Sequence, residues 1–196
     1  ELASGALKQA ILRKKGVTDD KIMAQVQPIT IDSHLLGNPW TNYGIYLINL
    51  LFPAVLQLMI IMMTVFAIGV ELKEKTSAEW LQNANNNMIV ALTGKLLPYT
   101  IIFGLLGLVS NVLLYRYMHF PMNSSIIWMF IATILYVLAS QSIGILIIGI
   151  VPVLRDGVAL SAFYGLLGFT FAGFTFPIEQ MVSNIQIFSY LFPIRY

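Results

Sequence analysis

The 196-residue chain has no cysteine, only two histidines and few charged residues. Without cysteine it cannot form disulfides, thiolate nucleophiles or sulfur-ligated zinc sites. Charged residues make up 10% of the chain, against roughly 25% in a soluble domain, and hydrophobic residues make up 58%. The formal net charge of +2 offers no dense basic surface for phosphates, so we expect no nucleic-acid partner. This composition predicts that most of the chain lies in a lipid bilayer.

Motifs for catalysis and nucleotide binding are missing too. Gly94-Lys95 resembles the end of a phosphate-binding loop, but Ile89 stands where the first glycine is needed and Leu96 where a hydroxyl is needed. His34 and His119 lie in separate predicted loops, which favours solvated side chains over metal ligands. We therefore predict no catalytic, cofactor-binding or metal site in this chain.

Four long apolar segments predict an all-α integral membrane protein built as a helical transmembrane bundle. No Asp, Glu, Lys or Arg lies in the middle third of any of them, which argues against an ion-coupled secondary carrier. Pro53 leaves two alternatives for the first span, a crossing that begins at Pro53 or one longer, kinked helix. The expected spans, each long enough for a bilayer, are residues 45–70, 96–115, 126–151 and 158–174.

Several polar and small residues lie within these spans. Polar side chains at membrane depth form hydrogen bonds between helices more often than they contact a substrate, and small residues allow helices to approach closely. The candidate pathway or helix-contact residues are Gln57, Asn111, Ser140, Gln141, Gly165 and Gly168.

Residues 1–42 differ in kind from the rest of the chain. Residues 2–15 are predicted to form a helix that ends at Gly16, and residues 25–34 alternate in the manner of an edge strand. Two elements of this size cannot bury a core alone. We interpret residues 1–42 as the C-terminal part of an extracytoplasmic domain, a small α+β remnant, and residues 43–196 as the transmembrane domain.

The polar stretch 69–95 joins the first two spans. Thr76 and Glu79 have the spacing of a capping box at the start of an amphipathic helix, predicted within residues 71–87. Trp80 and Leu81 lie on its apolar face, which would rest either on the bilayer surface or on a partner protein. Lys and Arg near the spans place this stretch in the cytoplasm and the N-terminal segment outside.

Residues 174–196 remain apolar but are interrupted by prolines and polar residues. Irregular backbone at membrane depth requires cover from protein or a wet cavity, so we expect two short helices that re-enter the outer leaflet as a hairpin. Pro177 would lie near the start of the first helix and Pro193 at the end of the second. Glu179 would bind backbone donors or meet substrate, and the structural role is favoured. The predicted external gate consists of Phe176, Pro177, Glu179 and Pro193.

Four motifs in this order resemble the membrane subunits of type-2 ATP-binding-cassette exporters. They lie at residues 38–43, at 71–81 together with 94–99, at 141–144, and at 176–181 together with 191–196. The resemblance covers nearly all of the chain from Gly37 onward. The chain departs from the family at Asn85-Asn86-Asn87, where a proline-bearing break is common, and at Val182, where proline often follows methionine.

The resemblance implies a multi-pass permease of the bacterial inner (cytoplasmic) membrane, in a drug- or multidrug-efflux-like branch with a large external domain. Its implied partners are an ATP-binding-cassette ATPase that binds ATP and Mg²⁺, a second permease copy or a paralogue, the lipid bilayer and a periplasmic adaptor. The expected function is export of an unidentified substrate, and the alternative is a non-transporting mechanotransmission subunit that drives an external domain. The implied ATPase-coupling residues are Glu71, Lys73, Glu74, Thr76, Glu79, Trp80, Leu81, Gly94 and Lys95.

Overall fold

The computed structural model describes residues 9–16, 43–122, 124–171 and 180–195. The chain divides into two units, residues 1–42 and Tyr43–Tyr196, and each is described by itself. In the first unit residues 9–14 are helical, and Gly16 has a φ of +74°, as expected for a glycine that ends a helix. The strand predicted at residues 25–34 lies outside the described residues, so the α+β remnant gains no support from them.

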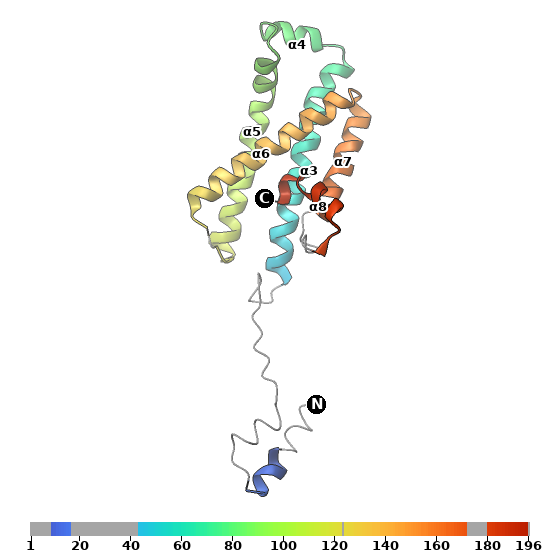
Figure 1. The fold of residues 1–196 in the computed structure, drawn as a ribbon. Coiled ribbons are helices and arrows are strands. Elements are labelled where there is room, and N and C mark those ends of the chain that lie inside the picture. Colours follow the sequence, from blue (N-terminus) through green and yellow to red (C-terminus); the bar gives the residue numbers. More distant parts are fainter. Residues whose placement is uncertain (1–8, 17–42, 123, 172–179, 196) are drawn as a thin grey trace. The chain divides into compact units, whose positions relative to one another are not determined.

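The described part of the second unit is helical and contains no strand, which confirms the all-α class. Helix α4 lies at one end of the unit, in the connection between α3 and α5, and the turn between α5 and α6 lies at the other end of α5 (Figure 1). The elements are α3 (Tyr43–Lys73), α4 (Ser77–Asn83), α5 (Met88–Val112), the π-helical η1 (Leu113–Tyr117), α6 (Ile126–Ile150), α7 (Leu154–Phe171), α8 (Ser183–Ser189) and the 3₁₀ helix η3 (Pro193–Arg195).

Three of these helices, α3, α5 with η1, and α6, are long and apolar enough to cross a membrane. Helix α5 begins at Met88 rather than near residue 96, because the Asn87 side chain accepts hydrogen bonds from the N–H groups of Ile89 (3.0 Å) and Val90 (3.4 Å). Helix α7 is shorter and carries Arg155 and Asp156 in its first turn, so it is not among the three. The fourth crossing, at residues 158–174, stays a prediction.

Helix α3 is continuous from Tyr43 to Lys73 with Pro53 inside it, which favours one longer helix over a helix that begins at Pro53. The residue at which the membrane crossing begins stays a prediction. The carbonyl of Pro53 accepts a hydrogen bond of 2.7 Å from the Tyr136 hydroxyl of α6. That bond ties the N-terminal half of α3 to α6.

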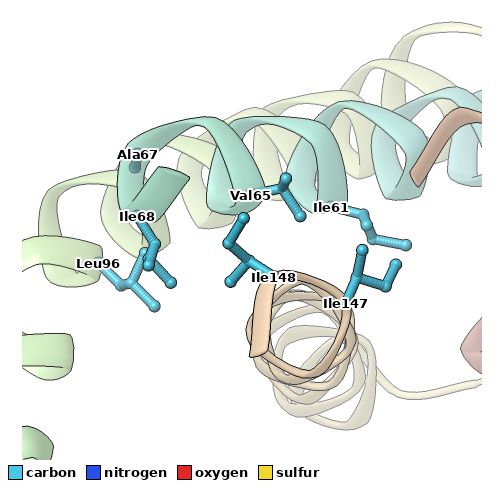
Figure 2. Packing of buried hydrophobic residues seen from close by; sticks show 7 residues of the cluster. All are labelled: Ile61, Val65, Ala67, Ile68, Leu96, Ile147 and Ile148. Carbon is cyan, nitrogen blue, oxygen red and sulfur yellow. The ribbon is translucent and has the colours of Figure 1, made fainter. Parts of the chain in front are cut away.

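The main core cluster lies where α3 meets α6. Ile61, Val65 and Ile68 of α3 point toward Ile147 and Ile148 of α6, and Leu96 of α5 closes one side of the cluster (Figure 2). Since α3 packs against α5, α6 and α7, it forms the centre of the unit.

Close contact between α7 and its neighbours depends on glycine. A Cβ atom at Gly165 would lie 2.5 Å from Leu58 Cδ1 of α3, and one at Gly168 would lie 3.1 Å from Phe192 Cδ1. At Gly165 and Gly168 the absence of a side chain therefore permits close packing within the chain. A role of these residues in a pathway stays a prediction.

The end of the chain folds back onto the bundle. Phe192 and Ile194 are buried. The centroid of the Phe192 ring lies 4.9 Å from that of the Tyr164 ring and 6.0 Å from that of the Phe171 ring. Pro193 opens η3 and does not end a helix, because α8 already ends at Ser189. Val182 precedes α8 with an extended backbone. Of the predicted gate, Phe176, Pro177 and Glu179 lie outside the described residues.

Candidate functional site: the corner between α3, α4 and α5

Glu71, Thr76 and Lys95 meet at the corner where α3 leads through α4 to α5. The Lys95 ammonium forms an ion pair with one carboxylate oxygen of Glu71, and the Thr76 hydroxyl donates to the other. The side chains of Lys95 and Glu71 are only 21% and 19% exposed. Lys95, and then Thr76, hold the pKa of the Glu71 carboxyl below its usual range by hydrogen bonding to its charged form. Three residues of the predicted coupling set are thus brought together.

The predicted capping box is wrong. The Thr76 side chain makes no cap hydrogen bond, and its backbone is helical (φ −88°, ψ −2°). The Thr76 N–H donates to the Glu71 carbonyl at 3.0 Å, so both the hydroxyl and the amide of Thr76 are directed to α3. Glu79 lies exposed in the first turn of α4, which spans Ser77–Asn83 and not the whole of residues 71–87.

Trp80 attaches α4 to the bundle. Its half-buried ring packs against the core cluster of α3, α5 and α6, and Lys95 Nζ lies 5.3 Å from the ring centroid. Leu81 is half-buried as well. The apolar face that the sequence assigned to a partner or to the bilayer is therefore occupied, at Trp80, by the chain itself.

Both ends of α4 turn through left-handed residues. Lys75 has a φ of 61° at the first turn, and Asn85 and Asn86 have φ values of 54° and 57° at the second. Asparagine tolerates this conformation better than most residues, and the Asn86 N–H donates to the Leu81 carbonyl at 2.9 Å. The asparagine run therefore ends α4.

The remaining coupling candidates lie at the rim of this corner. Lys73 and Glu74 form an exposed pair at 3.7 Å, with side chains 64% and 59% exposed. Gly94 is next to Lys95 and shares with it and Trp80 the lining of an open hollow of about 430 Å³. These positions, together with Glu79, are accessible to a partner.

Polar residues inside the bundle link its helices. The Tyr136 hydroxyl lies 3.2 Å from Gln57 Oε1, and Gln57 is 1% exposed. The Asn111 amide donates to Thr133 Oγ1 at 2.8 Å. Ser140 instead bonds to Tyr136 of its own helix, at 2.8 Å. Sequence reasoning missed Tyr136, although a tyrosine hydroxyl deep in an apolar span needs a partner.

Gln141 is held on one side only. Its Oε1 accepts a bond of 2.9 Å from the Thr100 hydroxyl, and within the described part of the chain its buried Nε2 has no partner. An unpaired buried donor costs stability, so this position is a weak point at the contact between α5 and α6.

A scan against protein-family models matches residues 2–196 to the model described as ABC-2 family transporter protein. The chain belongs to the ABC-2 transporter family. Searches of curated proteins and of solved structures found no match. As a member of the ABC-2 family, the chain is a membrane component of a transporter, and the family implies an ATP-binding-cassette ATPase as partner.

Proposed function

We propose that this ABC-2 permease exports a substrate across the bacterial inner membrane with ATP hydrolysed by a separate ATPase. The ATPase would bind ATP and Mg²⁺, and a second copy or a paralogue would complete the membrane part. We further propose the drug-efflux-like branch, with residues 1–42 as the end of a large external domain. The family assignment and the three apolar helices support the permease role.

The observation that carries the coupling role is the attachment of α4 to two membrane helices. Glu71 belongs to the last turn of α3 and Lys95 to α5, so their ion pair joins both helices at the corner that holds α4. Trp80 connects α4 itself to the same core. A push on α4 would therefore move α3 and α5 together.

The face of α4 that remains open is polar. Glu79, Gln82 and Asn83 are exposed on α4, and Met88 and Ile89 are exposed at the start of α5. We propose that the ATPase contacts this surface and that Trp80 transmits the movement from the side facing the bundle. Trp80 would then pass the movement of α4 to the core of the bundle, and we call this role the lever. Leu81 is the second candidate for this role.

Trp80→Ala tests this role. With the cognate ATPase in proteoliposomes, the variant is expected to bind the ATPase but to lose ATP-driven clearance of a panel of lipophilic dyes. Trp128→Ala is the matched control, because Trp128 is 67% exposed on α6 and its removal leaves the corner intact. Normal clearance by Trp80→Ala would refute the lever. If ATP hydrolysis changes the conformation of an external domain but the wild-type protein clears no dye, the alternative of a mechanotransmission subunit is favoured.

A further inference from the structure

A cleft of about 590 Å³ lies between α3, α5 and α6, and Pro193 and Ile194 of η3 contribute to its lining. Its size falls within the roughly 300–1,000 Å³ of small-molecule sites. No charged side chain lines it. Among its lining residues are Phe52, Leu56, Gly107, Met129, Ala132 and Tyr136.

A second cavity, of about 250 Å³, adjoins the first. The two share Asn111, Tyr115 and Met129, and the second reaches Arg116 at the end of α5 that is far from α4 (Figure 1). Because the two share these three residues, we treat them as one groove that leads toward the predicted outer surface. We call it the α5–α6 groove.

The polar residue Asn111 lines both cavities, and the charged residue Arg116 lines the second. Asn111 donates through its amide nitrogen to Thr133, and none of the described residues donates to its Oδ1. The π-helical turn η1 follows directly and contributes Tyr115 and Arg116. Such turns are frequently found at functional sites. An apolar channel with an acceptor midway and a cation at its end matches an amphiphile with an anionic head.

We propose that the α5–α6 groove binds the exported substrate and that this substrate is an anionic amphiphile of about fatty-acid size. Its apolar body lies in the cleft, a donor group reaches Asn111, and its anionic end meets Arg116. The substrate class rests on the proposed export function, whereas the binding itself does not need the ATPase.

Binding is measured with dansyl-undecanoic acid, which carries an apolar chain, a sulfonamide N–H and a carboxylate. The full chain is placed alone in phosphatidylcholine nanodiscs, and the rise in dansyl fluorescence is titrated. Ala132→Trp fills the cleft and should weaken binding at least tenfold, because the apolar body loses its place. Leu138→Trp is the control, since Leu138 is 45% exposed on the same helix but does not line the groove.

Arg116→Gln separates head-group recognition from simple partition into lipid. It should weaken binding of the acid about tenfold, the value of a charge-assisted contact, and leave binding of dansyl-undecanol unchanged. Equal effects on acid and alcohol, or wild-type affinity in Ala132→Trp, would overturn the proposal. So would fluorescence no higher than in nanodiscs of lipid alone, since the groove would then hold only phospholipid.

Transport then decides whether the bound molecule is the substrate. With the cognate ATPase, Ala132→Trp should lose ATP-driven clearance of dansyl-undecanoic acid while Leu138→Trp keeps it. If Ala132→Trp still clears the probe, the groove is not part of the export path. If the wild type binds the probe but Trp80→Ala exports normally, the lever proposed for α4 fails and the groove stands.

Discussion

Removing the ion pair between Glu71 and Lys95 tests whether this interaction holds the corner between α3, α4 and α5 together. Glu71→Gln and Lys95→Met each remove one charge and leave the other in a setting where about four-fifths of the side chain is covered. Exposed pairs contribute roughly 0.2–1 kcal/mol, and removal of one partner of a buried pair costs about 3–5 kcal/mol. Because this pair is partly exposed, we expect each substitution to lower the local stability of α4 by about 1.5 kcal/mol. This corresponds to a roughly tenfold increase in the equilibrium constant for local opening of α4.

The two substitutions should differ in size. Lys95 also lies over the Trp80 ring, so Lys95→Met removes two interactions and should cost more than Glu71→Gln. Thr76 still donates to residue 71 in either variant. The double variant should cost less than the sum of the two, since the same pair is lost in both.

Hydrogen exchange of the backbone amides of residues 74–87 measures this opening directly. The control is Glu74→Gln, which removes the exposed pair with Lys73 at 3.7 Å and should leave exchange within twofold of wild type. Additive effects of Glu71→Gln and Lys95→Met, or an equal loss of protection in Glu74→Gln, would refute the idea that the corner is held by this pair.

Two further predictions concern the bundle. Gly144→Ala should cost about 1–3 kcal/mol, because its Cβ would lie 2.7 Å from Thr64 Cβ, whereas Gly149→Ala on the same helix meets nothing within 4 Å and should be neutral or stabilising. Thermal unfolding in detergent compares the two, and equal midpoints would contradict the packing. Thr100→Val should cost about 1–3 kcal/mol because it leaves the Gln141 amide without a partner among the described residues, while Gln141→Leu should be close to neutral. The reverse order in the same assay would show that the Gln141 amide has another partner.

The long helices follow from the sequence alone. An apolar run in lipid must satisfy its own backbone hydrogen bonds, so about twenty such residues without a buried charge can only be helical. The charged interruption between Gly69 and Lys95 likewise predicted a connection that contains a short helix, and the structure places α4 there. The Glu71–Lys95 cluster also lies within the set of coupling residues chosen from the sequence.

Only the tertiary structure decided what those residues contact. A capping box links Thr76 to Glu79 three residues away, yet the Thr76 hydroxyl binds Glu71, and the Lys95 partner of Glu71 lies 24 residues along the chain. Helical periodicity put Trp80 on an apolar face but could not say whether that face meets a partner or the chain's own core. Sequence patterns record local spacing, whereas these contacts depend on how α3 and α5 pack side by side. That is why the elements were predictable and their contacts were not.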